Sequence, residues 1–267
     1  MNPMLNMAIK AAHEAGDIIA RSADRIDQLQ IENKDKNDFV TEVDRAAEST
    51  IIGILKRAYP DHSFLGEESG VHKGKNSGTS NYEWIIDPLD GTTNFIYGIP
   101  HYAVSIALKK DGKLDQAVVY DPIKDDLFYA SRGGGAFLNN RRIRVSKRLS
   151  LSNALLTTGI PYLPEHGDNI DNYFNTLKIL MVDTAGIRRP GSASLDLAYV
   201  AAGRYDGFWE FSLHEWDIAA GILLVQEAGG LIGDLKGGSS HLESGNICAA
   251  NPKVFKDMIK RLHTVLK

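Results

Sequence analysis

The sequence has only one cysteine, Cys248, among 267 residues. A lone thiol forms no internal disulfide, so the fold depends on its core, and this cysteine usage is typical of a reducing compartment. Long apolar runs are also missing, because no stretch approaches the ~20 residues that a membrane-spanning helix needs. Residues 1–16 place polar and charged side chains at helical spacing where a signal peptide has an unbroken apolar region. We therefore expect a soluble, cytoplasmic protein.

The chain carries little excess charge, with a formal net charge of −4, and 43% of its residues are hydrophobic. This composition suits a packed globular protein. It excludes a globally basic chain that binds nucleic acid or anionic membranes through its net charge. A local basic segment is present at residues 140–148, where five Arg or Lys residues interleave with Ile143 and Val145. Such a segment is typical of a solvated strand face.

The most informative stretch is WIIDPLDGTTN, residues 84–94. Its first residues are apolar and predict a buried strand. Asp87 and Asp90 follow, separated by Pro88 and Leu89. Proline fixes its own φ and favours an extended conformation in the residue before it, so we expect both acids near a stiff turn at the strand's end.

The residues after the second acid are suited to bind an anion. Gly91 allows the backbone to come close to a ligand. Thr92 and Thr93 are good residues to begin a helix, whose free N–H groups and positive dipole end favour phosphate. Two acids that face an anion site indicate a divalent metal between them.

The segments that precede this stretch predict two helices and a strand. Apolar residues at helical spacing near the N-terminus predict an amphipathic helix, and the polar residues 32–38 predict a loop. A second helix is expected over residues 44–59, with Thr41 as its N-cap, Asp44 in its first turn and Pro60 at its end. The simplest role of Asp44 is to complement the helix dipole.

A short strand at residues 63–65 leads into Glu67 and Glu68. Adjacent glutamates are usually solvated surface. They also stand at a strand end that precedes another acid-bearing strand end, which is where α/β proteins place ligands. Residues 71–81 are predicted to form a loop.

Residues 102–142 alternate in hydropathy and predict an antiparallel meander. Asp111 and Gly112 are a strong hairpin signal. The glycine triplet at residues 133–135 is followed by neither a helix nor a Lys-Ser/Thr pair, so it predicts a tight turn rather than a phosphate-binding loop.

The second half alternates strands and helices. Helices are expected near residues 173–181, 194–202 and 216–228 and from Pro252 onward, with short strands between them. Without a linker or an internal repeat, two packed subdomains, residues 1–150 and 151–267, with a site in the cleft between them, are the economical interpretation.

Asp217 stands at the start of the helix expected over residues 216–228, where a helix-dipole role is again the simpler explanation. Together with Glu67, Asp87 and Asp90, it makes four carboxylates at element ends that could converge. Four such groups without cations would repel one another, whereas hard cations such as Mg²⁺ prefer these oxygen ligands. Two metals about 4 Å apart could clamp the attacking and leaving oxygens of an in-line phosphoryl displacement.

Three segments resemble one family. The segments Glu67-Glu68-Ser69, DPLDGTTNF from Asp87, and WDIAAGILLVQEAGG from Trp216 are similar to those of the inositol monophosphatase family, in the same order and spacing. The short loops between them resemble its bacterial SuhB-type branch. The resemblance implies an α/β fold, a layered αβαβα sandwich, a homodimer, and a lithium-sensitive, Mg²⁺-dependent phosphatase.

The resemblance also implies ligands for two to three Mg²⁺ ions. The first ion would be held by Glu67, Asp87 and the carbonyl of Leu89, with Thr92 nearby. The second would be held by Asp87, Asp90 and Asp217, and a third, weaker ion would sit near Glu67 through water. Asp44 would accept a hydrogen bond from Thr92 and, with Glu67, orient and deprotonate the attacking water.

The substrate contacts implied by the resemblance fall into two groups. The phosphate would rest on Glu67, Leu89, Asp90, Gly91 and Thr92. The polyol would be lined by Gly191, Ser192, Ala193, Glu210 and Asp217. Arg188 and Arg189 would either bind substrate or pair across a dimer interface. Either Lys34 or Lys36 would be the family's mobile-loop lysine, and Pro190 departs from the small hydroxyl or apolar residue of many relatives.

The predicted function is Mg²⁺-dependent hydrolysis of myo-inositol monophosphate and related polyol or sugar phosphates. One alternative keeps the site and changes the substrate, to fructose 1,6-bisphosphate, histidinol phosphate or a 3′-phosphonucleotide. Another is a partner of the transcription machinery in antitermination and ribosomal RNA synthesis, using residues 140–148 and the dimer surface. The acidic net charge favours a protein partner over direct RNA binding.

Overall fold

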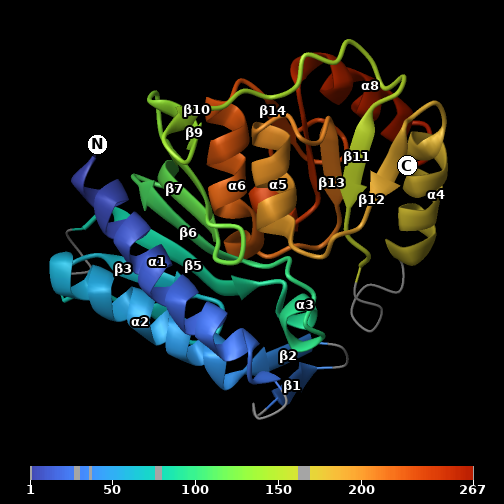
Figure 1. Ribbon diagram of the computed structural model, residues 1–267. Coiled ribbons are helices and arrows are strands. Elements are labelled where there is room, and N and C mark those ends of the chain that lie inside the picture. Colours follow the sequence, from blue (N-terminus) through green and yellow to red (C-terminus); the bar gives the residue numbers. More distant parts are fainter. Residues whose placement is uncertain (1, 27–30, 36–37, 76–79, 162–168, 267) are drawn as a thin grey trace.

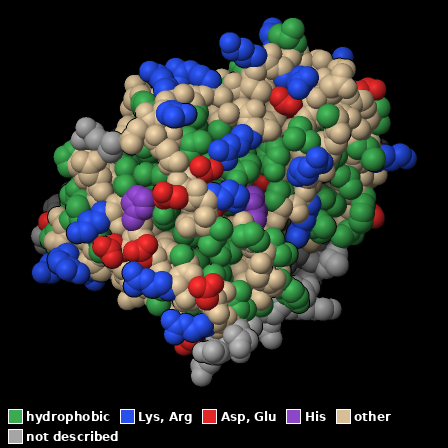
Figure 2. Space-filling model, in the orientation of Figure 1, with side chains coloured by type: hydrophobic (Ala, Val, Ile, Leu, Met, Phe, Trp, Pro, Cys, Tyr) green, Lys and Arg blue, Asp and Glu red, His purple; other side chains and the backbone are tan. Residues whose placement is uncertain are grey.

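The computed structural model describes residues 2–26, 31–35, 38–75, 80–161 and 169–266. Helices and sheets alternate in five layers, which Figure 1 shows from the helix pair at lower left to the helices at upper right. The expected αβαβα sandwich is confirmed. Charged side chains of both signs are interspersed on the face in Figure 2, without a broad field of one sign. No described helix is long and apolar enough to span a membrane.

The first layer is the pair α1 (Pro3–Ala23) and α2 (Glu42–Ala58). The buried stripe of α1 contains many alanines, so the two helices pack closely against each other and against the first sheet. Thr41 caps α2: its hydroxyl accepts the Val43 N–H, and Asp44 accepts the Thr41 N–H in return. The cap predicted from the sequence is therefore confirmed, with the helix starting two residues earlier.

The second layer is an eight-stranded sheet in the order β10-β9-β8-β7-β6-β5-β3-β4. Its strands are β3 (Ser63–Gly66), β4 (Gly70–His72), β5 (Tyr82–Asp90), β6 (Ala103–Lys110), β7 (Lys113–Asp121), β8 (Asp126–Ser131), β9 (Gly135–Leu138) and β10 (Arg141–Arg142). All pairs are antiparallel except β3 with β5. Asp111 and Gly112 have φ of 52° and 70°, as the predicted β6–β7 hairpin turn requires.

Two segments predicted as loops contain strands. Residues 32–38 were expected to be irregular, but β1 (Ile31–Asp35) and β2 (Asp38–Thr41) form an antiparallel pair. β4 likewise lies in the expected 71–81 loop, paired with β3. Both predictions were wrong because ladder hydrogen bonds use backbone groups, which any non-proline residue supplies, so short strands need no apolar pattern.

The middle layer holds α5 (Ala193–Ala201) and α6 (Glu215–Glu227), buried between the two sheets. Small side chains permit this close packing. A Cβ on Gly221 would lie 2.5 Å from the Leu197 side chain, so α5 and α6 touch at a glycine. The helix after Asp217 was expected to be small and apolar, and its side chains are buried on nearly all sides.

The fourth layer is a five-stranded sheet in the order β12-β11-β13-β15-β14. Its strands are β11 (Leu155–Thr158), β12 (Gly186–Arg188), β13 (Gly207–Glu210), β14 (Leu231–Gly233) and β15 (Ile247–Ala250). The fifth layer is α4 (Asn169–Met181) and α8 (Pro252–Leu262) on its outer face. The remaining helices are short: α3 (Thr92–Ile96) was expected, whereas α7 (His241–Ser244) was not.

The glycine triplet forms a turn, as predicted, with Gly133 and Gly135 at positive φ. Its N–H groups nevertheless do bind an anion. The N–H groups of Gly133 and Gly135 donate to the two carboxylate oxygens of Glu227 at 2.7 and 2.8 Å. The C-terminal end of α6 is thereby fixed to the β8–β9 turn.

Candidate active site

A β-bulge brings two aspartates of β5 to one face of the sheet. In β5, Asp87 and Asp90 lie three residues apart, a spacing that points side chains of a regular strand to opposite faces. Their partners on β6, Ser105 and Ala103, are two residues apart and share a face. The extra residue in β5 therefore turns both aspartate side chains to the same face of the sheet. It falls beside Pro88, which has no N–H to donate to the neighbouring strand.

Glu67 enters the same region from the neighbouring strand. Its N–H donates to the Ile86 carbonyl at 3.1 Å, which places it beside Asp87 as the chain leaves β3. Glu48 of α2 stabilises the turn that follows β3. Its buried carboxylate accepts the Glu68 N–H at 2.9 Å. A Cβ on Gly66 would lie 2.5 Å from that carboxylate, so the glycine makes room for it.

Asp217 reaches the site from the first turn of α6. One of its oxygens accepts the His214 N–H at 2.7 Å and so caps its own helix. The start of α6 is tied to the first sheet, because the Ser105 hydroxyl donates to the Trp216 carbonyl at 3.3 Å. Asp217 therefore caps α6, as an acid in the first turn can, and the start of this helix lies beside β6.

The charges of Glu67 and Asp90 raise the pKa of two neighbouring acids, Asp87 and Asp217. Burial is the largest cause for Asp87, whose pKa lies well above its usual value, and the charges of Glu67, Asp90 and Asp217 add to it. The pKa of Asp217 is raised in the same way, by burial and then by Glu67 and Asp90. Acids from two strands and one helix therefore meet in one electrostatic environment.

This donor set fits a divalent cation in its chemistry. The groups are hard oxygen donors, and a cation would relieve the mutual repulsion that raises their pKa. They do not form a ready-made coordination shell: across the described parts of the chain, no three His, Cys, Asp or Glu side chains are arranged as metal ligands. Coordination would require these side chains to turn toward a common point.

Thr92 and Asp44 are joined directly, as the family resemblance implied. The Thr92 hydroxyl lies 3.0 Å from Asp44 Oδ1 and 3.0 Å from the Leu89 carbonyl oxygen. Asp44 is buried, and its other oxygen accepts from the hydroxyl and N–H of Thr41. Burial raises the pKa of Asp44, while the hydrogen bonds from Thr41 and Thr92 lower it.

The turn after β5 packs against the turn before α5. Gly91 has φ of 101°, and a Cβ there would lie 3.1 Å from the His101 carbonyl oxygen and 3.2 Å from that of Gly191. Asn94 bridges the two turns, donating to the carbonyls of Pro190 and His101, each at 2.8 Å. The helix expected at Thr92 is only five residues long, so the tight backbone turn, more than a helix dipole, defines this part of the site.

Of the polyol-side residues predicted at 191–193, Ser192 and Ala193 lie at the start of α5 and contact Asp90. Its Oδ2 accepts hydrogen bonds from the Ser192 hydroxyl at 2.7 Å and from the N–H and hydroxyl of Ser194 at 2.7 and 2.5 Å. Ala193 adds a backbone N–H. These contacts join the end of β5 to the start of α5, more than a hundred residues away in the sequence.

Glu210, at the end of β13, stands against Gly159. Any Cβ on Gly159 would overlap the Glu210 carboxylate, which also accepts the Gly159 N–H. Burial, followed by the charge of Asp90, raises the pKa of Glu210 to about 8. A second buried acid, Asp196, faces it, and burial and then the Glu210 charge raise the Asp196 pKa well above its usual value.

The arginine whose charge reaches this pair is Arg189. It lowers the pKa of both Glu210 and Asp196, whereas Arg188 acts on the pKa of Tyr205. Of the two lysines considered for the mobile loop, Lys36 lies outside the described residues, and only the backbone of Lys34, in β1, is described.

Sequence reasoning missed several residues that support the site. Glu48, Asn94, Gly159, Ser194 and Asp196 contact or face its main residues. Asn94 is the last residue of the 84–94 stretch and Ser194 directly follows residues 191–193, and these positions are the one signal that could have suggested a role for them.

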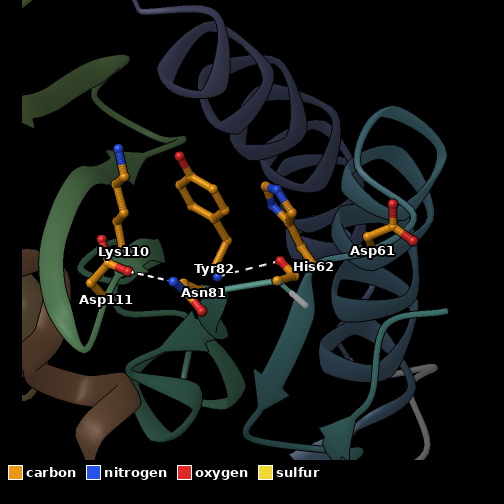
Figure 3. Close-up of a pocket in the computed structure, with 7 residues that line it drawn as sticks. Asp61, His62, Asn81, Tyr82, Lys110 and Asp111 are labelled. Atoms are coloured by element: carbon orange, nitrogen blue, oxygen red, sulfur yellow. Dashed lines mark hydrogen bonds between the residues drawn. The ribbon is translucent and has the colours of Figure 1, made fainter. Parts of the chain in front are cut away.

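A separate hollow lies at the opposite end of β5 from these acids. Its residues include Asp61, His62, Tyr82 and Lys110, and its volume is about 360 Å³. In Figure 3 the rings of His62 and Tyr82 lie face to face, with centroids 4.6 Å apart. None of the predicted site residues lines this hollow, so it is not the site assembled above.

Fold and site together define a layered α/β protein with a cluster of buried acids where two sheets meet two buried helices. The chain belongs to the inositol monophosphatase family, because the family model with that description matches residues 1–266. It is 58% identical over 259 residues to the Nus factor SuhB of Pseudomonas aeruginosa, covering 97% of this chain and 95% of the relative.

Two solved structures share the whole fold. The extragenic suppressor protein SuhB of Bartonella henselae is 46% identical with a TM-score of 0.93, covering 98% of each chain. The inositol monophosphatase of Anabaena (Nostoc) sp. PCC 7120 is 37% identical with a TM-score of 0.86, covering 98% of this chain and 95% of that one.

Proposed function

We propose that this protein is a Mg²⁺-dependent phosphatase that hydrolyses myo-inositol monophosphate and related polyol phosphates. Family membership supports phosphatase chemistry in general. The observation that carries the proposal is the meeting of Glu67, Asp87, Asp90 and Asp217 beside the Thr92–Asp44 hydrogen bond, where the charges of Glu67 and Asp90 raise the pKa of Asp87 and of Asp217.

Glu67, Asp87, Asp90, Asp217 and the Leu89 carbonyl would hold the cations. Bound divalent cations supply Lewis acidity, which polarises phosphoryl oxygens and acidifies water. The chain's own contribution is to restrain one oxygen of each of two of these carboxylates with a backbone N–H, which leaves the other oxygen to turn toward a cation. Asp87 Oδ1 is restrained by the Leu89 N–H at 3.0 Å, and Asp217 by the His214 N–H.

Thr92 and Asp44 would manage the proton of the attacking water. A threonine hydroxyl that donates to Asp44 Oδ1 keeps a lone pair with which it can accept a proton from water. Asp44 is itself fixed by two contacts with Thr41. This chain of fixed groups orients the water and moves its proton toward a carboxylate.

Glu210 would recognise the hydroxyls of the polyol. It stands on the second sheet, while the phosphate-side turn belongs to the first, so a substrate would bridge the two. Its carboxylate accepts the Gly159 N–H, which fixes the direction in which the remaining acceptor sites point. Arg189, on the neighbouring segment, contributes positive charge to the same end.

A panel of phosphate esters tests the proposal. Phosphate release from inositol 1-phosphate, fructose 1,6-bisphosphate, histidinol phosphate and a 3′-phosphonucleotide would be compared by kcat/KM with Mg²⁺, with added Li⁺ and with a chelator. We expect inositol 1-phosphate to be preferred, activity to require Mg²⁺ and Li⁺ to inhibit. Preference for another ester would reassign the substrate, and turnover in the chelator would reject the mechanism.

We also propose a homodimer. Tyr97 and Ile99 are exposed beside Ile123, and the Lys124 ammonium donates to the Pro100 carbonyl at 3.2 Å, which brings the two segments together. Figure 2 shows hydrophobic side chains gathered around this part of the molecule. Sedimentation of wild type and Ile99→Glu tests this: the variant should be monomeric, and an unchanged sedimentation coefficient would refute the assignment of the interface.

A second function, as a protein partner of the transcription machinery, is favoured by one observation. The relative from Pseudomonas aeruginosa, 58% identical, is named a Nus factor. The tagged protein should retain transcription factors in a salt-dependent manner, and Asp90→Asn should retain them equally if binding is independent of catalysis. Failure to bind at low salt would reject this function.

A further inference from the structure

The start of α5 is capped by a residue from a different subdomain. Ser192 occupies the N-cap position, but its side chain makes no capping hydrogen bond to its own helix. Serine at this position usually accepts the N–H of the second or third helical residue. Here Asp90 Oδ2 accepts the N–H of Ser194, the second residue of α5, and the Ser192 hydroxyl donates to the same oxygen.

Ser194 contributes a second contact that capping does not require. Its hydroxyl lies 2.5 Å from Asp90 Oδ2, in addition to its N–H at 2.7 Å. Ser192 and Ser194 are both buried, at 2% and 0% exposure, so water cannot replace either donor. One carboxylate oxygen is therefore fixed by three donors from one short segment.

The three donors are two hydroxyls and one backbone N–H, and all of them point at the same oxygen of Asp90. The N-terminus of a nine-residue helix adds positive potential at the same oxygen. Hydrogen bonds from outer-shell groups orient the carboxylates that bind a cation.

We propose that Ser194 is a positioning residue for Asp90, whose hydroxyl fixes the carboxylate as a ligand and thereby raises the affinity of the site for divalent cations. The inference rests on the proposed function, since it takes the cation as the ligand. It adds a role for a residue on the second subdomain that does not itself touch the metal.

The test measures the binding of Mn²⁺ to the full chain, without substrate, by electron paramagnetic resonance or calorimetry. Removing an outer-shell partner typically lowers metal affinity by about 10-fold to 100-fold. Because Ser194 is one of several donors to Asp90, we expect Ser194→Ala to raise the Mn²⁺ dissociation constant about 10-fold. A matched control is Ser131→Ala, which loses a 2.5 Å hydroxyl contact to Gln116 remote from the site.

The outcomes separate the two levels of the argument. If Ser194→Ala binds Mn²⁺ as tightly as wild type, the positioning role is wrong and the proposed function stands. If wild type binds no Mn²⁺, the proposed function fails and the inference fails with it. If Ser194→Ala and the control Ser131→Ala weaken Mn²⁺ binding equally, the effect is a general loss of stability, and the inference is overturned. Should Ser194→Ala not fold, Ser192→Ala removes another donor to the same oxygen and is expected to weaken binding similarly.

Discussion

Thr92 and Asp44 lie 48 residues apart in the sequence, and their side chains meet at 3.0 Å. Asp44 also completes the capping box of α2, so one carboxylate holds a helix start with one oxygen and a site hydroxyl with the other. A residue with two such duties couples the stability of α2 to the geometry of the site.

Removing the Thr92 hydroxyl should slow the chemical step. Thr92→Val keeps the shape of the side chain and loses the proton path, and general acid–base contributions are typically about 100-fold or more. We expect kcat for inositol 1-phosphate to fall on the order of 100-fold, with Mn²⁺ affinity unchanged. Thr93→Val, on the exposed neighbouring residue, is the control and should keep wild-type kcat. Equal rates for Thr92→Val and wild type would remove Thr92 from the mechanism.

Gly159 should be needed for substrate recognition. A methyl group there would occupy the place of the Glu210 carboxylate and displace it. Losing hydrogen bonds to a charged group corresponds to a change in affinity of about tenfold, so Gly159→Ala should raise KM about tenfold. Gly53→Ala in α2 has no atoms within 4 Å of the added Cβ and should leave KM unchanged. An unchanged KM in Gly159→Ala would exclude Glu210 from substrate binding.

Asp196 should make stability fall as pH rises. Its Oδ1 is buried without a hydrogen-bond partner in the part of the chain that the structure describes, and its folded pKa is raised by burial and by Glu210. From about pH 4, the unfolded value, upward to the raised folded pKa, the folded state retains a proton that the unfolded state releases. Rising pH therefore favours unfolding in this window.

The comparison is between urea midpoints of wild type and Asp196→Asn at pH 5 and pH 8 in a chelator. Wild type should lose more stability than the variant between these two pH values, and the variant should be the more stable at pH 8. Asp17→Asn, on the exposed side of α1, controls for the loss of one charge. A parallel pH dependence in wild type and Asp196→Asn would show that Asp196 ionises freely in the folded protein.

Glu227 should stabilise the fold without affecting catalysis. It accepts the N–H groups of Gly133 and Gly135, and hydrogen bonds to a charged group contribute about 1.5–3 kcal/mol when buried. Because the turn is exposed, we expect Glu227→Ala to lower the free energy of unfolding by only about 1–2 kcal/mol, with kcat/KM unchanged. Gln226→Ala, at the exposed neighbouring position, should change neither quantity. A loss of activity in Glu227→Ala at full folding would contradict this purely structural role.

Much of the fold follows from periodicity and turn chemistry. The helix from Glu42 is predicted by Thr41 and Asp44, and the β6–β7 hairpin is predicted by Asp111 and Gly112. Both predictions succeed because each depends on residues that are neighbours in the sequence. The strands β1 and β4 escaped prediction since their backbone pairing has no side-chain signature. The small helix α7 has no buried side chain and hence no apolar stripe to detect.

The site was only partly accessible from sequence. Carboxylates at the ends of predicted strands and helices can be found one by one in the sequence. The β-bulge that puts Asp87 and Asp90 on one face of the sheet depends on the pairing of β5 with β6, which the sequence does not show. The support of Asp90 by Ser194, 104 residues away, is a tertiary contact with no sequence periodicity behind it. Family resemblance supplied the Thr92–Asp44 contact, whereas the helix position of Asp44 suggested only that it complements the helix dipole.

The central claim is that carboxylates of the first sheet and of α6 act through a divalent cation to hydrolyse a phosphate monoester. Phosphate release from inositol 1-phosphate by wild type and Asp90→Asn, each with Mg²⁺ and with a chelator, tests it most directly. We predict turnover by wild type only with Mg²⁺, and a loss on the order of 100-fold or more in Asp90→Asn with its folded structure intact. Wild-type turnover in the chelator, or full activity in Asp90→Asn, would contradict the account.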